Sequence, residues 1–355
     1  MIIHKNCDFI FAFEASMTNP NGDPDQENKP RMDYETNTAL VSDARRKRDV
    51  RNYFKAKGFP IFVDTLNEQK VPMETMLEYY RNQYLTDPDK MRQLFSAHPK
   101  IKELWETLAS KSKKTTYLDI YNDSDFQKDK KEFGHFNNLF ITALIQDALI
   151  DIRLFGSAMA VENVSRTFTG PVQITWGYSM HPVELVKSNT ITSIMNDDNS
   201  TFGKKHKLYY GLFIHAGTIN KFSAQLTGMT EQDQALFRKA LVQGMLINQT
   251  DSKQGQTPLF YLEVQYKPEF DGFLGDMRRF IKVEYQKDRP IRCLNDLTIQ
   301  DGALAQAIKQ MKNRGYIECV RAWFHPIHDL QKSFSLDVDE TIDLWEPVEQ
   351  TGMRK

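Results

Sequence analysis

The order in which strand-like and helical segments follow one another limits the folds open to this chain. Helical patterns at 43–58 and 230–245 begin after the N-cap residues Ser42 and Thr230. Runs rich in β-branched and aromatic residues predict four strands, at 8–15, 170–180, 209–219 and 260–267. The resulting order, β-α-β-β-α-β, is that of ferredoxin-like folds, which include the common RNA-recognition domain. We therefore predict the α+β class, with a modified RNA-recognition (ferredoxin-like) fold.

Segments outside this order are interpreted as additions to it. Residues 60–136 carry helical patterns interrupted by prolines, which favours a helical insertion. Residues 181–207 form a long polar connection between the two middle strands, and connections of this length are usually functional. The predicted division is a ferredoxin-like palm (1–59 and 137–267), a helical insertion (60–136), an arm within the palm (181–207) and a C-terminal extension of mixed helix and strand packed on the palm (268–355).

The overall charge does not by itself indicate a protein that binds polyanions. The 355 residues include 46 Lys and Arg and 47 Asp and Glu, so a nucleic-acid site requires local clustering of cations. The widely spaced Cys7, Cys293 and Cys319 argue against a disulfide framework or a zinc ribbon. No stretch approaches a membrane span, and the first residues are too polar for a signal peptide. We expect a cytoplasmic protein without membrane contact.

The helix predicted at 43–58 has two unlike faces. Its apolar face includes Val50 and Phe54, and between Ser42 and Lys57 seven cations accompany two acids, which predicts a field that attracts phosphate. The cations opposite the apolar face are Arg45, Arg48, Arg51 and Lys55. The preceding loop adds Lys29 and Arg31. An ordinary solvated surface is the alternative. On either interpretation, the arginines at 48 and 51 are expected to be replaceable without loss of the fold.

The 181–207 arm combines a flexible turn with cations. The sequence FGKKHK at 202–207 carries Lys204, Lys205 and Lys207, and Met195 with its apolar neighbours could wedge against bases. A hairpin with a charged tip explains the same pattern. Both interpretations stay open on the sequence alone.

No segment assembles a recognisable catalytic or metal-binding motif. Asp23, Asp25 and Glu27 could hold a divalent cation, yet Asn, Gly, Asp and Pro at this density ordinarily build turns. The sequence lacks a phosphate-binding P-loop, a dinucleotide glycine fingerprint and a serine elbow. The spacing of Cys319, His325 and His328 could permit zinc binding, but three residues are too few for a tetrahedral set of ligands. We expect no cofactor, no metal and no catalysis.

Three blocks of sequence together resemble one known family. The first block, at 9–54, reads FIFAFEASMTNPNGDPDQENKPRMDYETNTALVSDARRKRDVRNYF. The others are DIRLFGSAM at 151–159 and GPVQITWGYSMHPV at 170–183. This combination resembles the backbone subunit of type I CRISPR interference complexes (Cascade), in the RAMP superfamily, with the subtype I-B branch most similar.

The resemblance implies an RNA-binding protein shaped like a right hand. The insertion at 60–136 would form the fingers, and 181–207 would form a β-hairpin thumb that kinks the CRISPR RNA at regular intervals. Several copies would assemble into a helical filament along that RNA. The residues expected to contact RNA, from the resemblance and the charge pattern together, are Lys29, Arg31, Arg45, Arg48, Arg51, Lys55, Arg153, Gly156, Ser157, Ala158, Met159, Arg166, Met195, Lys204, Lys205 and Lys207.

The implied function is that of a non-catalytic subunit that holds CRISPR RNA and presents it for pairing with target DNA. Its partners would be the CRISPR RNA, target DNA through the guide, further copies of itself and other Cascade subunits. A variable guide sequence requires binding through the RNA backbone. Two alternatives remain: a type III backbone subunit that cleaves target RNA with a loop aspartate, here Asp197 or Asp198, and a free-standing RNA-binding protein.

Overall fold

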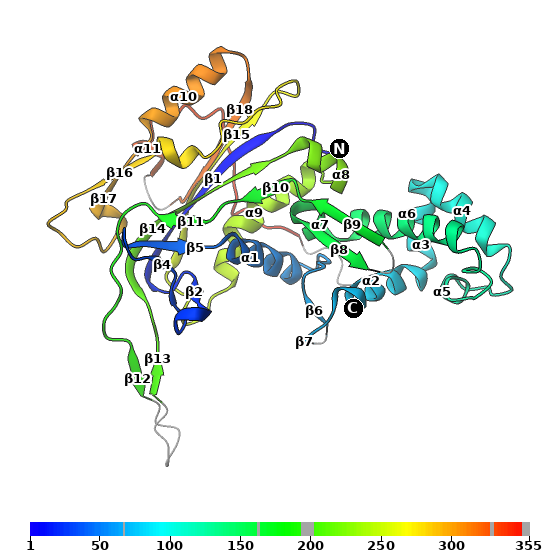
Figure 1. Ribbon diagram of the computed structural model, residues 1–355. Coiled ribbons are helices and arrows are strands. Elements are labelled where there is room, and N and C mark those ends of the chain that lie inside the picture. Colours follow the sequence, from blue (N-terminus) through cyan, green and yellow to red (C-terminus); the bar gives the residue numbers. More distant parts are fainter. Residues whose placement is uncertain (67, 162–163, 193–201, 327–329, 350–355) are drawn as a thin grey trace.

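One sheet runs through the centre of the molecule, and helices cover both of its faces (Figure 1). The computed structural model describes residues 1–66, 68–161, 164–192, 202–326 and 330–349. Over these residues the sheet has nine strands, which in spatial order are β19 (Glu340–Thr341), β18 (Ile317–Phe324), β15 (Gln256–Tyr266), β1 (Cys7–Thr18), β14 (Leu208–Ile219), β11 (Gly177–Ser179), β5 (Thr38–Val41) and β4 (Met32–Asp33), with β10 (Val172–Ile174) also paired to β14. The predicted α+β class is confirmed.

The central strand β1 is buried on both faces. It pairs antiparallel with β14 on one side and with β15 on the other. Phe9, Phe11 and Phe13 lie in one hydrophobic cluster, and Ile10 and Ala12 lie in another across the sheet. A strand covered on both faces has a nearly continuous apolar sequence, which explains why this strand could be recognised from residues 8–15.

Three helices cover the face of the sheet that carries Phe9. Helix α1 (Asp43–Ala56) precedes the insertion, while α8 (Lys221–Thr227) and α9 (Glu231–Ile247) connect β14 to β15. The predicted caps are confirmed: the side chains of Ser42 and Thr230 each accept a backbone N–H in the first turn of α1 and α9. The predicted succession of strand, helix, strand, strand, helix and strand is therefore observed in β1, α1, β11, β14, α9 and β15.

The helical insertion has a hydrophobic cluster of its own and extends away from the sheet (Figure 1, cyan and green helices). The Trp105 ring lies 4.9 Å from the ring of Phe126 and 5.6 Å from that of Phe136. The predicted boundary between residues 136 and 137 is wrong, because it falls inside a helix whose later side chains stay in this cluster. The elements are β6 (Thr65–Leu66), β7 (Gln69–Lys70), α2 (Met73–Leu85), α3 (Pro88–Ala97), α4 (Pro99–Ala109), α5 (Tyr117–Tyr121) and α6 (Lys130–Ala148).

A short helix and a hairpin lead from the insertion back to the sheet. Helix α7 (Ile150–Phe155) is followed by the antiparallel pair β8 (Gly156–Val161) and β9 (Val164–Thr169). Gly156 has a φ of 70°, and a Cβ atom there would lie 1.9 Å from the carbonyl oxygen of Phe168, so the position requires glycine. The family resemblance implies a loop at 156–159, but these residues begin strand β8.

The connection between β11 and β14 projects from the sheet as a β-hairpin, at the bottom of Figure 1. Its strands are β12 (Thr190–Thr192) and β13 (Phe202–Lys204), and the predicted hairpin is confirmed. Nearer the sheet, Val186 N–H donates to the carbonyl of Lys207, and Lys205 N–H donates to that of Asn189. We call residues 182–192 and 202–209 the thumb stem. Met195, Asp197 and Asp198 lie outside the described residues.

The C-terminal part covers the second face of the sheet. Leu304 and Ile308 of α10 (Gly302–Asn313) pack in the same cluster as Ile10 of β1, and β18 extends the sheet beside β15. None of the described helices is long and apolar enough to cross a lipid bilayer. The elements not yet located are the short η1 (Pro24–Gln26), β2 (Gly22–Asp23) and β3 (Lys29–Pro30), then η2 (Met277–Phe280), β16 (Lys282–Tyr285), η3 (Leu294–Asp296), β17 (Leu297–Gln300) and α11 (Leu330–Ser333).

Candidate nucleic-acid interface

Two loops meet beside the C-terminal end of β1. Residues 19–31 continue from that strand, and residues 250–255 lead from α9 into β15. The Lys253 ammonium donates to the carbonyl oxygens of Asn19 and Pro20, at 2.8 and 3.2 Å, and the Thr18 hydroxyl donates to the carbonyl of Ser252. We call residues 19–31 and 250–255 the loop cluster. These contacts between distant segments hold the turn-rich loop in one place.

The loop cluster also contacts the first turn of α1 and an exposed tryptophan. The Asn21 side-chain oxygen accepts hydrogen bonds from the backbone N–H and the hydroxyl of Ser42, at 2.8 and 2.9 Å. The Arg31 guanidinium lies 5.8 Å from the centre of the Trp176 ring and 3.5 Å from Asp23. The cations of the loop and the start of the helix therefore share one surface, as predicted from their proximity in sequence.

The thumb stem contacts the loop cluster through exposed ion pairs. The Lys204 ammonium lies 3.7 Å from Glu27, which is also 3.8 Å from Lys29, and the Lys205 ammonium lies 2.7 Å from Asp251. The Lys204 and Lys205 side chains are 57% and 45% exposed. Exposed pairs of this kind contribute about 0–1 kcal/mol to stability. A phosphate group can replace the carboxylate at little cost, which makes these lysines accessible to RNA.

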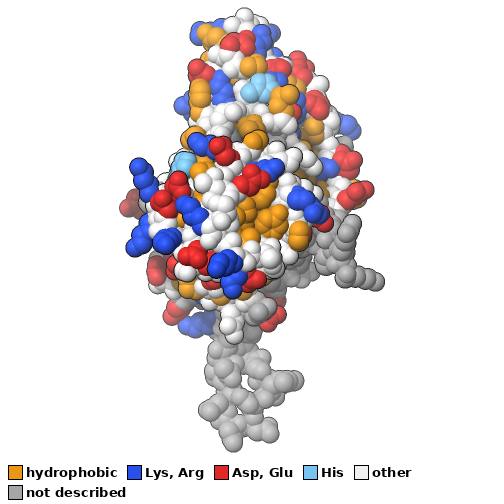
Figure 2. Space-filling view, turned by 90° about the vertical axis from the view of Figure 1, so that its right-hand side faces the viewer, with side chains coloured by type: hydrophobic (Ala, Val, Ile, Leu, Met, Phe, Trp, Pro, Cys, Tyr) orange, Lys and Arg blue, Asp and Glu red, His pale blue; other side chains and the backbone are white. Residues whose placement is uncertain are grey.

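Acidic side chains offset much of the charge that the sequence pattern predicted. The same mixture is seen on the side of the molecule where the helical insertion lies, since positively and negatively charged side chains are interspersed over the described part of the face in Figure 2. Beside α1, Asp64 approaches from the segment that directly follows the helix, and Asp151 approaches from a segment far away in the sequence. These carboxylates reduce the positive field that the sequence predicts along the helix.

The cations of α1 differ in how much of each side chain is accessible. Arg46 is fully buried, with its guanidinium 4.8 Å from the Phe13 ring centre and 3.1 Å from Asp49. Arg45 lies 2.8 Å from the same carboxylate and is 20% exposed. Arg48 is exposed and donates to the carbonyl of Val63. The 53% exposed Lys55 lies 2.8 Å from Asp64. Arg48 and Lys55 thus remain candidates for phosphate contact.

Arg51 is part of a buried network rather than of the accessible surface. Its Nε donates to Asp151 at 3.0 Å, and that carboxylate is fully buried. Asp151 also accepts the backbone N–H groups of Phe62 and Val63, at 2.8 and 3.1 Å. The network joins α1, α7 and the entrance to the insertion. This geometry argues against the expectation that Arg51 can be replaced without loss of the fold, because removing it leaves a buried carboxylate without its cation.

Arg153 is likewise bound within the protein. Its Nε and Nη2 donate to the two oxygens of Asp233, at 2.9 and 2.8 Å, and its Nη1 donates to the carbonyls of Gln146 and Asp147. Asp233 is buried and belongs to the capping box of α9. The guanidinium therefore fixes α7 to α9 and the end of α6, which gives Arg153 a structural role, and its predicted contact with RNA stays a prediction.

The remaining candidates lie on the β8–β9 hairpin. Ser157 is half-buried, Ala158 and Met159 follow it on β8, and Met159 is the register partner of Arg166 on β9. The hairpin begins next to α1, since the Phe155 ring lies 5.2 Å from the Arg51 guanidinium. Contacts of these residues with RNA stay predictions.

Two residues of this surface were missed by the sequence analysis. Trp176 is 45% exposed between β10 and β11 and offers a ring on which a base can stack. Lys253 lies within the loop cluster, where burial and the nearby Arg45 and Arg46 lower its pKa to about 7. The only signals in the sequence were a lone Trp before a Gly and a lone Lys in a turn. Neither is specific.

The residues considered for metal binding have other contacts. Asp23 caps the turn at Asp25 and approaches Arg31, while Glu27 approaches lysines. Among the described residues, no three His, Cys, Asp or Glu side chains form a group that could hold a metal ion. His325 packs its ring 5.0 Å from that of Trp345, and His328 lies outside the described residues.

Comparison with known proteins supports the resemblance that the sequence suggested. The model of the family described as CRISPR-associated protein Cas7 matches residues 5–301, which include the loop cluster, α1 and the thumb stem. A protein of Haloferax volcanii with the same description is 23% identical over 373 residues, covering 97% of this chain and 94% of the relative. A solved chain from a CRISPR RNA-guided surveillance complex in its pre-nicking state, 15% identical, aligns with a TM-score of 0.53 over 95% of this chain and 96% of its own length, so the two share a fold. This chain therefore belongs to the CRISPR-associated Cas7 family.

Proposed function

We propose that this protein is a non-catalytic, CRISPR RNA-binding backbone subunit of a type I interference complex, most similar to subtype I-B. Several copies assemble along the guide, next to the other subunits, and present it for pairing with target DNA. The observation that carries the proposal is the contact between the thumb stem and the loop cluster, where Lys204, Lys205 and Lys29 lie in weak, exposed ion pairs. Phosphate can compete for such cations whatever the base sequence.

The proposal includes a cytoplasmic location. The cysteines at 7, 293 and 319 are free, and that at 293 is exposed, as suits a reducing compartment. Binding through phosphates, with base pairing left to the guide, also matches the demands of a variable spacer sequence.

The direct test is the affinity of the purified chain for two single-stranded RNAs of unrelated sequence, measured by fluorescence anisotropy at several salt concentrations. Similar affinities that weaken steeply with salt support phosphate binding. Tight binding to only one of the RNAs, or an affinity independent of salt, contradicts it. Gel filtration with a full-length guide RNA then separates a filament of several copies from a free-standing RNA-binding protein.

The cleaving alternative has its own test. We expect the double substitution Asp197→Ala with Asp198→Ala to leave target interference intact, because the proposal assigns these residues no catalysis. Metal-dependent cleavage of a complementary RNA by the parent chain, lost in the double variant, assigns the protein to the cleaving class.

A further inference from the structure

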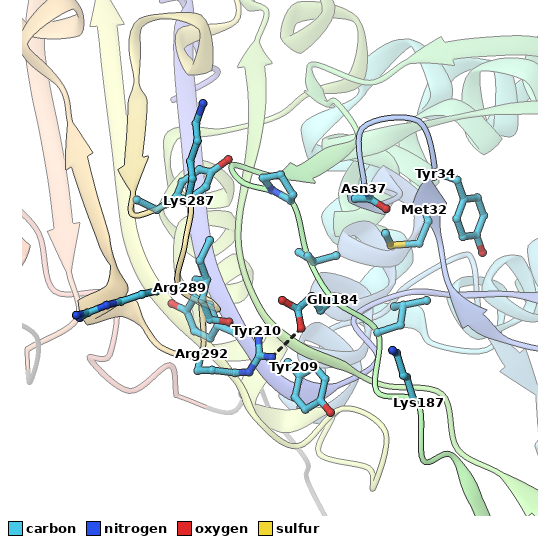
Figure 3. Close-up of a pocket in the computed structure, with 15 residues that line it drawn as sticks. Met32, Tyr34, Asn37, Glu184, Lys187, Tyr209, Tyr210, Lys287, Arg289 and Arg292 are labelled. Atoms are coloured by element: carbon cyan, nitrogen blue, oxygen red, sulfur yellow. Dashed lines mark hydrogen bonds and ion pairs between the residues drawn. The ribbon is translucent and has the colours of Figure 1, made fainter.

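A groove of about 870 Å³ opens at the base of the thumb stem. One wall consists of thumb-stem residues 182–187 with Tyr209 and Tyr210 (Figure 3). The loop between β16 and β17 contributes residues from Tyr285 to Arg292, and the turn between β4 and β5 contributes the third wall, including Tyr34. The groove thus brings together three segments that are far apart in the sequence. None of the residues proposed above to contact RNA lines this groove.

The groove carries an excess of positive charge. Four cations and a single carboxylate line it, and the carboxylate, Glu184, lies 2.7 Å from Arg292. Lys187, Lys287 and Arg289 are exposed, and they form no ion pair with any described residue. This differs from the loop cluster, where acidic side chains accompany most of the cations. Unpaired cations in a concave surface favour a polyanionic ligand.

Aromatic rings accompany these cations. Tyr34 is 53% exposed, and its hydroxyl donates to the side chain of Gln26 in the loop cluster. Tyr209 is half-buried, with the Arg292 guanidinium 4.2 Å from its ring centre. Exposed tyrosine rings beside cations are the components of surfaces that bind single-stranded nucleic acids, where bases stack on rings and cations hold the phosphates. A duplex cannot use the rings, because its bases are already stacked.

The thumb stem connects the groove to the loop cluster. Val186 N–H donates to the carbonyl of Lys207, and Lys205 N–H donates to the carbonyl of Asn189 on the same leg as Lys187. Lys187 therefore lies across the stem from two lysines of the proposed RNA surface. Since Lys187 also lines the groove, it links those lysines to the groove.

We propose that this groove is a second nucleic-acid site, which holds a short single-stranded segment with a base stacked on Tyr34 and phosphates bound by Lys287 and Arg289. This proposal rests on the proposed function, which identifies the ligand as a nucleic acid. The groove is a separate site from the RNA surface described above. The segment comes from the guide RNA or from a DNA strand of the target. The two sources share the chemistry of base and phosphate, so the experiment distinguishes them.

The test compares charge variants of the full chain. Lys287→Ala with Arg289→Ala removes two groove cations, and Lys309→Ala with Arg314→Ala removes two exposed cations on and after α10 as a matched control. One arm measures the binding of a labelled single-stranded RNA across salt concentrations. The other arm measures the binding of a labelled, non-complementary single-stranded DNA to the chain already loaded with unlabelled guide.

We expect the groove variant to weaken one arm about tenfold near 0.1 M salt and to reduce the slope of log affinity against log salt by about 1.4, while the control binds as the parent does. A change in the RNA arm assigns the groove to the guide, and a change in the DNA arm alone assigns it to a target strand. Parent-like binding by the groove variant in both arms overturns the proposal and leaves an acidic protein segment as the occupant. The proposed function survives that result, because it is tested separately by the RNA binding of the parent chain.

A second pair of variants tests the stacking step. Tyr34→Leu removes the ring from an exposed position, and Tyr34→Phe keeps the ring but loses the hydroxyl. We expect the Leu variant to bind about tenfold more weakly in the arm identified above and the Phe variant to bind like the parent. Equal binding by the Leu variant and the parent overturns the stacking of a base on Tyr34.

Discussion

The cations of α1 and α7 and those of the thumb stem look alike in the sequence but have different surroundings in the fold. Arg51 and Arg153 lie against carboxylates that are almost fully buried, at 0% and 5% exposure, and each joins two or more helices. Lys204 and Lys205 lie against carboxylates that are 63% and 61% exposed. The burial of the partner, more than the presence of an ion pair, separates structural cations from cations available to a ligand.

This difference has a physical origin. A buried carboxylate has lost its hydration, so removing its cation leaves an uncompensated charge in a medium of low polarity. An exposed carboxylate regains water when its lysine moves away, and salt already weakens the pair. RNA phosphates can therefore recruit the thumb-stem lysines but not the arginines that hold the helices together.

The strongest test of the comparison is Arg51→Ala. We expect it to lower the free energy of unfolding by about 3–5 kcal/mol, because Asp151 stays buried without its cation. Urea unfolding followed by circular dichroism measures the change. The control is Arg48→Ala, an exposed neighbour whose loss should change stability by only about 0.5 kcal/mol. Equal stability of the two variants would mean that burial of the partner does not distinguish these arginines.

Gly156→Ala should have the next largest effect and should act on stability rather than on RNA. The φ of 70° and the approach of the Phe168 carbonyl leave no room for a Cβ atom, so we expect a loss of about 1–3 kcal/mol. Thermal unfolding measures it, and RNA affinity per folded molecule should match the parent. Reduced affinity at unchanged stability would indicate that this glycine approaches the RNA backbone itself.

The loop cluster predicts a pH dependence of RNA binding. Since the pKa of Lys253 is lowered to about 7, its neutral form dominates above that pH, and a nearby phosphate favours the charged form. Binding should take up a proton and weaken several-fold between about pH 6.5 and 8.5. Lys253→Met should flatten this profile. If the RNA affinity of the parent chain does not change with pH over this range, the claim that a phosphate lies near Lys253 is contradicted.

The same pKa predicts the direction of a stability change. The unfolded chain keeps the Lys253 proton up to about 10.5, so between pH 7 and 10.5 it binds more protons than the folded chain. The contribution of Lys253 to stability therefore rises with pH across this window. The unfavourable contribution of its buried charge is fully present below pH 7.

The smallest effect is expected for Lys55→Ala. This side chain is 53% exposed, so its loss should change stability by less than about 0.5 kcal/mol. If it contacts one phosphate, the salt slope of RNA binding should fall by about 0.7. Anisotropy titrations at several salt concentrations measure the slope, and an unchanged slope removes Lys55 from the RNA surface.

The sequence predicted those parts of the fold that rest on local signals. Strand β1 was recognisable because its alternating faces are both apolar, and α1 and α9 were recognisable because Ser42 and Thr230 mark their first turns. An arm was expected from the length of a single connection, and the hairpin within it was expected from the turn at 202–207 and from the family resemblance. The predicted boundary between residues 136 and 137 falls inside α6. The apolar pattern continues without a break along this helix, so the sequence gives no sign of where the insertion ends.

The candidate site was predictable only in part, because ion pairing depends on contacts between distant segments. A helical projection places Arg48 and Arg51 on one face, but Asp151 approaches Arg51 alone, from α7, 100 residues later in the chain. Arg153 meets Asp233 across 80 residues. Lys253 was missed because its significance comes from Asn19, Pro20 and Arg45, which the fold brings to it.

The central claim is tested most directly by the salt dependence of RNA binding in the Lys204→Ala, Lys205→Ala double variant. The control is Lys309→Ala with Arg314→Ala, which removes the same charge from α10 and its C-terminal end. We expect the thumb-stem variant to unfold like the parent and to lose about 1.4 from the slope of log affinity against log salt, while the control keeps the parent slope. A thumb-stem variant with the parent slope and affinity would contradict the claim that these exposed lysines bind the phosphates of RNA.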